Sequence, residues 1–147
     1  MLRRSLLALT LGAALVGGAQ ALEYRSVAVP LTVFHDAPSA QGKKLFIARE
    51  GMPLEILVQV EGWTKVRDAE GTIAWVERSA LGTKRTLVVT AATAEIRQSP
   101  SPEAPVLFQA EKWVALEWQE PAAQGWVRVR HKDGQSGFVR VTQVWGL

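Results

Sequence analysis

Hydrophobic and polar residues alternate with a period of two over many short stretches of the chain. From Trp63 to Arg67, Trp63, Lys65 and Arg67 share one face of an extended segment, and Thr64 and Val66 share the other. A period of two is typical of β-strands, and clusters of glycine, proline and aspartate separate the stretches. The pattern predicts an all-β protein with strands at residues 27–29, 32–34, 45–48, 54–60, 63–67, 72–76, 85–89, 95–97, 106–110, 114–119, 125–130 and 136–139.

The second half of this pattern repeats the first. The motif Gly-Trp-x-Lys/Arg-Val-Arg occurs at residues 62–67 and 125–130, and Pro-Ser followed by Leu-Phe-x-Ala begins at residues 38 and 100. Residues 85–89 echo residues 25–29 and are expected to open the second copy. A repeat of this length indicates a duplicated small domain. We expect domains at 22–81 and 82–147, with residues 82–84 as a short linker.

Small units of this kind need extra burial to be stable. A domain of about 60 residues buries only about 60% of the surface of its unfolded chain. The chain has no cysteine, so disulfide bonds and thiolate metal sites are excluded. Six tryptophans are available for the cores. We therefore expect the two units to pack against each other.

The first 21 residues have the three regions of a secretory signal peptide. Arg3 and Arg4 supply a basic start, residues 5–16 are apolar, and Ala19-Gln20-Ala21 has the small-x-small pattern of a cleavage site. Cleavage is expected between Ala21 and Leu22. The alternative is an uncleaved membrane anchor, but the apolar run is shorter than the roughly 20 residues of a membrane span. The mature protein is predicted to be periplasmic or secreted and to have no membrane span.

The charge balance narrows the class of partner. The chain has 17 basic and 14 acidic residues, and removal of Arg3 and Arg4 leaves 15 and 14. Proteins that bind nucleic acids usually carry a basic patch, and none is visible along this sequence. We therefore expect no nucleic acid as a partner.

Each copy resembles the bacterial SH3-like domain, often written SH3b. The resemblance rests on the Pro-Ser loop, the Leu-x-x-Ala strand, the Gly-Trp motif, the turn glycine and the aromatic-valine pairs Trp75-Val76 and Phe138-Val139. It covers residues 22–81 and 82–147. The resemblance implies two tandem SH3-like β-barrels of five strands each. It also implies a non-catalytic role at the bacterial cell envelope, because similar domains bind peptidoglycan or peptides and target cell-wall hydrolases.

The residues offer no support for catalysis. A Cys-His pair is impossible without cysteine, and the two histidines, His35 and His131, occupy non-equivalent places in the repeat. We expect both to be exposed loop residues. Gly134-Gln135-Ser136-Gly137 lacks the spacing of a nucleophile elbow and is predicted to be a turn. The chain is predicted not to be an enzyme and to bind neither a cofactor nor a metal ion.

Tryptophans beside basic residues are the candidate binding residues. On an outward face, such a ring forms a shallow platform for a sugar ring or an extended peptide. In the alternative, each ring folds over the mouth of the barrel and closes the core. Trp75 and Phe138, by contrast, are predicted to be core residues. The candidates in the two copies are Trp63 with Lys65 and Arg67, and Trp126 with Arg128 and Arg130.

Two further tryptophans, Trp113 and Trp118, have no aromatic counterpart in the first copy, which has Gly51 and Ile56 there. They are predicted either to fill the interface between the copies or to form a site unique to the second copy. Trp113 joins the candidate ligand residues. Trp145 is expected to dock the end of the chain onto the barrel.

Together these observations predict an exported binding module that recognises peptidoglycan or an envelope peptide or protein. The first alternative is a structural accessory or scaffold subunit of an envelope complex, with its aromatic residues buried. The second is an inert activator of a cell-wall hydrolase. We expect a monomer.

Overall fold

The computed structural model describes residues 21–147, without the side chain of Ala122. The predicted signal peptide covers residues 1–21, so all of it except Ala21 lies outside the described residues.

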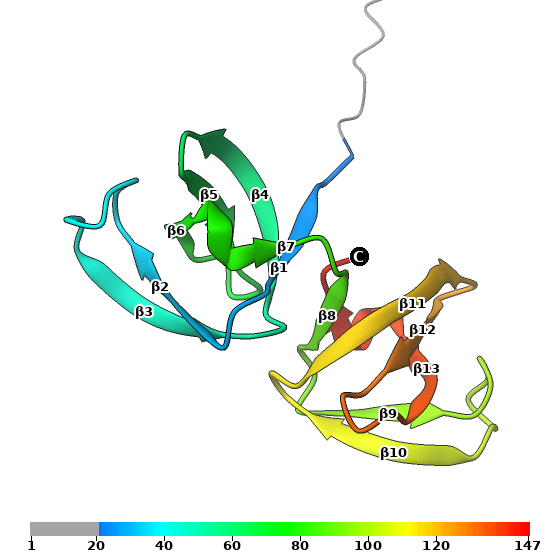
Figure 1. Cartoon of the computed structure of the whole chain (residues 1–147). Helices are drawn as coiled ribbons and strands as arrows, with labels where there is room; N and C mark the ends of the chain where they lie inside the picture. Colours follow the sequence, from blue (N-terminus) through cyan, green and yellow to red (C-terminus); the bar gives the residue numbers. More distant parts are fainter. Residues whose placement is uncertain (1–20) are drawn as a thin grey trace, which may run out of the picture.

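Two β-structured units lie side by side (Figure 1), and the predicted all-β fold of two small barrels is confirmed. Between residues 21 and 147, no helix is long and apolar enough to cross a membrane.

The two units contain the same elements in the same order. The first unit consists of β1 (Tyr24–Val27), β2 (Leu31–His35), β3 (Lys44–Arg49), β4 (Pro53–Val60), β5 (Trp63–Arg67), β6 (Ile73–Glu77), the 3₁₀ helix η1 (Arg78–Ala80) and β7 (Leu81–Gly82). The second consists of β8 (Thr86–Val89), β9 (Thr93–Arg97), β10 (Val106–Glu111), β11 (Ala115–Ala123), β12 (Trp126–Arg130), β13 (Ser136–Arg140), η2 (Val141–Gln143) and β14 (Val144–Trp145).

Each unit forms one antiparallel sheet with the same strand order. The orders are β3-β2-β6-β5-β4-β1-β7 and β10-β9-β13-β12-β11-β8-β14. Tyr24 pairs with Glu55 in the first sheet, and Thr86 pairs with Glu117 in the second. Tyr24 is therefore equivalent to Thr86. The predicted match of residues 25–29 with 85–89 is wrong by two positions, because short apolar runs match in several registers and only the hydrogen bonds select one.

Alternation along the strands places one face of each sheet in a core. Thr64 and Val66 of β5 are buried, and their equivalents Val127 and Val129 are buried in β12. Trp75 and Phe138 are only half-buried and lie outside this inward set. The prediction that both are core residues is wrong, because their buried neighbours on β6 and β13 fill the small barrels instead.

Arg85, in the segment between β7 and β8, binds the two units together. Its guanidinium carbon lies 5.2 Å from the ring centroid of Tyr24 and 5.0 Å from that of Trp118. Arg85 Nη2 donates a hydrogen bond of 2.7 Å to the carbonyl oxygen of Gly146. A planar guanidinium can stack on aromatic faces while it donates in its own plane. Arg85 therefore connects the first unit, the second unit and the end of the chain.

Further contacts reinforce this junction. The rings of Tyr24 and Trp145 meet edge to face with centroids 5.3 Å apart. Thr86 Oγ1 donates to the carbonyl oxygen of Gly51 at 2.8 Å, and Ser26 Oγ donates to that of Lys84 at 2.7 Å. Trp145 thus docks the chain end as predicted, and it does so against Tyr24 of the first unit. The end of the chain lies beside the junction in Figure 1.

We predict that Arg85→Ala lowers the free energy of unfolding by about 2–4 kcal/mol, because two stacking contacts and one charged hydrogen bond are lost together. Urea unfolding followed by circular dichroism measures the change. Arg25→Ala is the matched control, because Arg25 stacks on no ring and makes only local contacts: a surface ion pair with Glu23 at 2.7 Å and a hydrogen bond to the adjacent Tyr24 carbonyl oxygen at 3.1 Å. Such a surface ion pair is worth less than about 1 kcal/mol. Equal effects of the two substitutions would contradict the role of Arg85.

The junction also predicts a response to alkaline pH. Burial, and secondarily the negative charge of Glu55, raises the pKa of the Tyr24 hydroxyl above its ordinary value of 10.0. The folded state therefore holds this proton more tightly than the unfolded state. The stabilising contribution is complete below about pH 10 and is lost as the pH rises through the folded-state pKa. We predict that Tyr24→Phe loses less stability than the parent protein in this range, as measured by urea unfolding from pH 8 to pH 12.

Candidate junction groove

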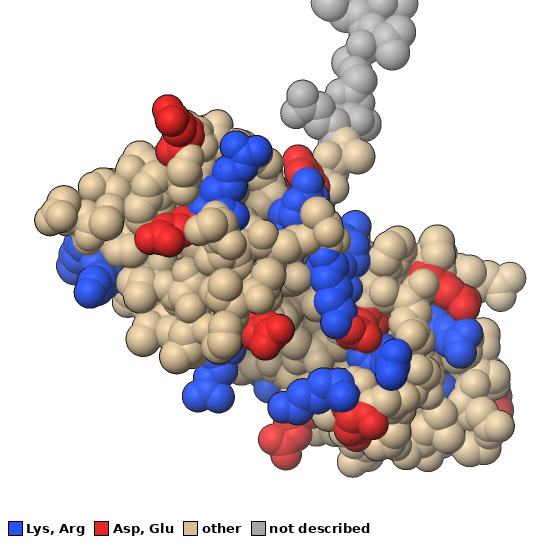
Figure 2. All heavy atoms as spheres, viewed as in Figure 1, with Lys and Arg blue, Asp and Glu red and all other residues tan. Residues whose placement is uncertain are grey.

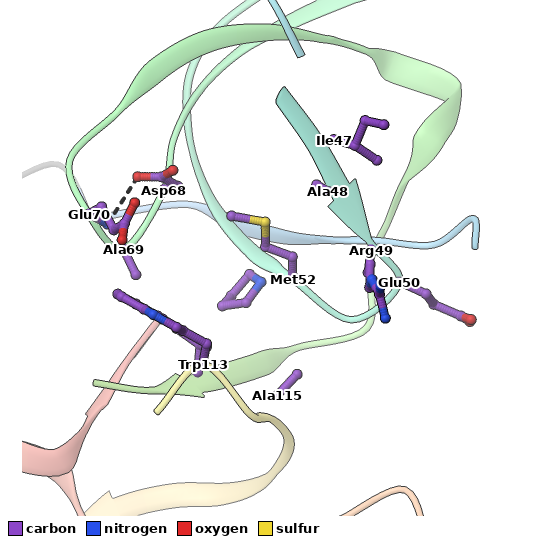
Figure 3. Close-up of a pocket in the computed structure, with 12 residues that line it drawn as sticks. Ile47, Ala48, Arg49, Glu50, Met52, Asp68, Ala69, Glu70, Trp113 and Ala115 are labelled. Atoms are coloured by element: carbon purple, nitrogen blue, oxygen red, sulfur yellow. Dashed lines mark hydrogen bonds between the residues drawn. The ribbon is translucent and has the colours of Figure 1, made fainter. Parts of the chain in front are cut away.

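A groove of about 320 Å³ lies between the two units. Figure 3 shows Trp113 on one side of it, with Met52 near the centre and Ile47 on the other side. Its apolar lining comes from both units: Ile47, Met52 and Pro53 from the first, and Val88, Trp113 and Ala115 from the second. Neither barrel could form this groove alone. No sequence pattern predicted it, because its walls meet only through the junction.

Trp113 holds an unusual backbone conformation. Its φ is +72°, in the left-handed region, and the equivalent residue Gly51 has a φ of +88°. Both amides donate equivalent hydrogen bonds of 2.8 Å, from Gly51 to Val27 and from Trp113 to Val89. Glycine adopts this conformation freely, whereas a residue with a Cβ loses about 1–2 kcal/mol. The first copy shows that the turn folds well with glycine, so its formation does not explain the tryptophan.

The side chain of Trp113 is also accessible. It is 45% exposed, whereas large aromatic rings are usually buried in cores or interfaces. Lys112 Nζ lies 4.7 Å from the centroid of its ring, which is a cation–π contact. Lys112 itself does not line the groove. A strained backbone and an exposed ring together are typical of a functional residue.

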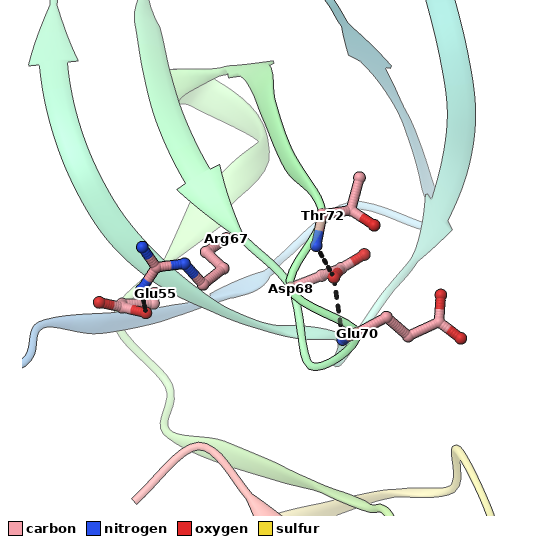
Figure 4. Close-up of polar contacts among 5 residues, drawn as sticks. All are labelled: Glu55, Arg67, Asp68, Glu70 and Thr72. Carbon is pink, nitrogen blue, oxygen red and sulfur yellow. Dashed lines mark hydrogen bonds and ion pairs between the residues drawn. The ribbon is translucent and has the colours of Figure 1, made fainter.

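One end of the groove is formed by the β5–β6 turn. Asp68 Oδ1 accepts hydrogen bonds from the backbone amides of Glu70 at 3.0 Å and Thr72 at 2.8 Å (Figure 4). Beside the turn, Arg67 Nη1 donates to Glu55 Oε2 at 2.8 Å. These bonds fix the turn and hold Glu70 at the groove. Of the charged residues that line the groove, three are acidic, Glu50, Asp68 and Glu70, and one is basic, Arg49.

The predicted tryptophan platforms lie on the outward faces of β5 and β12, in different sheets. Trp63 is half-buried, and His35 meets its ring edge to face with centroids 5.2 Å apart. Trp126 is only 6% exposed, and the guanidinium carbon of Arg140 lies 4.6 Å from its ring centroid. Trp63 therefore offers part of its ring to solvent, and Trp126 offers very little. Their role in binding remains a prediction.

The basic residues predicted beside these rings are largely engaged with other groups. Lys65 Nζ lies 5.9 Å from the ring centroid of Trp75. Arg67 forms its ion pair with Glu55, and Arg128 Nη1 lies 2.8 Å from Glu120 Oε1. Arg130 is exposed. Figure 2 shows basic and acidic side chains interspersed over the face in view.

The two histidines differ in environment. His35 is the last residue of β2 and is buried, so the prediction that it is an exposed loop residue is wrong. The cause is the ring of Trp63, which covers this outward position from β5. His131 lies in the β12–β13 turn and is partly exposed, with Nδ1 3.1 Å from Asp133 Oδ1. Among residues 21–147, no three histidine, aspartate or glutamate side chains are grouped as metal ligands.

Comparison with known proteins finds a sequence family that covers most of the chain. Residues 28–82 and residues 90–146 each match the family described as "Bacterial SH3 domain". No curated protein matches the chain.

Three solved structures are similar to the chain at low sequence identity. They are NlpC2 from Trichomonas vaginalis (14% identity, TM-score 0.40, covering 87% of this chain and 49% of that one), NlpC1 from Trichomonas vaginalis (14%, 0.40, 95% and 50%) and an NlpC/P60 family protein from Bacillus cereus (16%, 0.38, 84% and 56%). The chain spans about half the length of these proteins.

The different burial of the two repeated tryptophans predicts different costs of removing them. Trp126→Ala is expected to lower the free energy of unfolding by about 3 kcal/mol or more, the usual cost of truncating a buried aromatic ring. Trp63→Ala is expected to cost less than about 2 kcal/mol, because part of its ring is already in water. Urea unfolding of the two variants measures both. A larger loss for Trp63→Ala would contradict the burial described above.

Proposed function

The chain belongs to the bacterial SH3 domain family, and on that basis we propose that it is an exported, non-catalytic binding module of the cell envelope. Its ligand is peptidoglycan or an envelope peptide or protein, and the ligand occupies the junction groove against Trp113. Bacterial SH3 domains are typically extracytoplasmic, which agrees with the predicted signal peptide. The mature protein then begins at Leu22, with domains at 22–81 and 82–147.

The observation that carries this proposal is the conformation of Trp113. The equivalent turn in the first copy has glycine and makes the same backbone hydrogen bond. A tryptophan there loses backbone energy and places an accessible ring at a groove. Binding to a ligand compensates for such a loss, because aromatic rings bury large areas on binding. Trp63 and Lys65 do not line the groove, and they stay candidate contacts for a ligand that extends beyond it.

A non-catalytic role is supported by the composition of the chain. The chain has no cysteine and only two histidines, and these lie on different units in unlike surroundings. The two family matches together cover most of residues 28–146. The alternative is an accessory subunit that holds an envelope complex together without a small-ligand site. The packed junction suits both roles, whereas the exposed ring of Trp113 favours binding.

We predict that Trp113→Gly and Trp113→Ala both reduce retention on purified peptidoglycan sacculi or on the envelope ligand by tenfold or more, a size typical of the loss of an aromatic anchor. Sedimentation with sacculi measures the first ligand, and titration followed by tryptophan fluorescence measures a peptide.

The same pair of variants separates binding from folding. Trp113→Gly restores the residue of the first copy, so its melting temperature is expected to equal or exceed that of the parent. Trp113→Ala keeps the left-handed strain and is expected to melt a few degrees lower than Trp113→Gly. A sharp fall in melting temperature for both variants would show that the ring is structural and that the proposed site is wrong.

A further inference from the structure

Strand β3 has a free edge in the first sheet. It is the outermost strand and, among residues 21–147, pairs only with β2. The amide of Glu50 donates to the carbonyl oxygen of Pro30 at 3.2 Å, and Val33 lies opposite Ile47. Hydrogen-bonded and non-hydrogen-bonded pairs alternate in an antiparallel ladder. Residues 46, 48 and 50 therefore bond toward β2, and Ile47 turns its N–H and C=O toward the free edge.

The junction groove runs along this edge. Ile47, Ala48 and Arg49 are consecutive residues of β3 that all line it. Consecutive strand residues point their side chains to opposite faces. A groove that touches all three therefore lies against the edge of the strand and not against one face. Figure 3 shows Trp113 across the groove from Ile47.

Two outward positions beside this edge are apolar in the first copy and polar in the second. Leu31 of β2 is 59% exposed and Ile47 of β3 is 63% exposed. The strand registers make Thr93 and Gln109 their equivalents in the second copy. Exposed apolar residues on neighbouring strands at a free sheet edge mark an interaction surface.

We propose that the ligand of the junction groove is an extended L-peptide segment of an envelope protein, which adds to the first sheet as a strand beside β3. The segment exchanges hydrogen bonds with the N–H and C=O of Ile47 and places one apolar side chain between Met52 and Trp113. This inference rests on the proposed function and specifies its ligand. Backbone bonding supplies affinity and alternate side chains supply specificity, as in other strand additions.

The charges around β3 specify the ends of the segment. Glu50, Asp68 and Glu70 outnumber Arg49 at the groove, and Lys43 and Lys44 lie exposed at the opposite end of β3. Opposite charges across adjacent strands stabilise pairing. The segment therefore carries a basic residue at the groove and an acidic residue near Lys43 and Lys44. Trp113 and the β5–β6 turn line the groove across from Ile47, so the edge suits a single free segment better than the sheet of a second folded copy.

The probe is a synthetic L-octapeptide of alternating valine and threonine, with lysines at one end and glutamates at the other. Its control carries N-methyl groups on the central amides, which abolish strand pairing. We expect the probe, and not its control, to slow hydrogen exchange at the Ile47 amide measured by NMR. The amide of Gln109, at the equivalent free edge of β10, is expected to be unaffected.

A matched pair of proline variants tests the backbone contact. Ile47→Pro removes an N–H that faces the free edge, where proline is tolerated, and Gln109→Pro does the same in the second copy. We expect Ile47→Pro to weaken probe binding about tenfold or more, from the lost hydrogen bond and the blocked approach of a strand. Gln109→Pro and Ile47→Val are expected to bind as the parent does. The hydrogen-exchange measurement on the parent protein tests strand addition even where Ile47→Pro folds poorly.

The outcomes separate the two proposals. If the probe binds in a Trp113-dependent way but leaves the Ile47 amide unprotected, strand addition is wrong and the groove remains a binding site. If sacculi bind through Trp113 and the probe does not bind at all, the ligand is peptidoglycan and the inferred segment is wrong. If neither the binding of sacculi nor the binding of the probe depends on Trp113, both proposals fail. Probe-independent dimers that protect Ile47, detected by light scattering, would assign the edge to a second copy instead.

Discussion

The rest of the structure depends on one contact, the stacking of Arg85 between Tyr24 of the first barrel and Trp118 of the second. The edge-to-face contact of Tyr24 with Trp145 and the hydrogen bond from Thr86 to Gly51 add to it at the same junction. With it, the free edge of β3 and the ring of Trp113 face the same groove. The junction is thus a condition for the candidate site, although none of its three residues lines the groove.

Duplication gives each position an internal reference. Gly51 and Trp113 occupy the same turn and make the same hydrogen bond, so their difference is not required for folding. The same holds for Leu31 of β2 and Ile47 of β3, whose equivalents in the second copy are Thr93 and Gln109. The features that the two copies share are explained by the requirements of folding and stability. Two of the differences, Ile47 and Trp113, line the groove where the two barrels meet.

The sequence was sufficient for the fold because its period-two pattern and its repeat are local properties of the chain. It was sufficient to single out Trp113, since an aromatic residue at a glycine position is visible in the aligned copies. The sequence did not predict how far Trp75 and His35 are buried, because their burial depends on side chains from neighbouring strands. The sequence also did not predict the register of β8 or the groove, because both are decided by hydrogen bonds and packing between distant segments.

The two copies contribute different parts of the groove. The first barrel supplies the free strand edge, the apolar outward residues and the acidic turn held by Asp68. The second supplies the aromatic ring, at a turn that would be more relaxed with glycine. The first barrel alone would keep its strand edge but would have no Trp113 across from it. Tandem duplication provides that second wall, and divergence at one turn residue is enough to place an anchor on it.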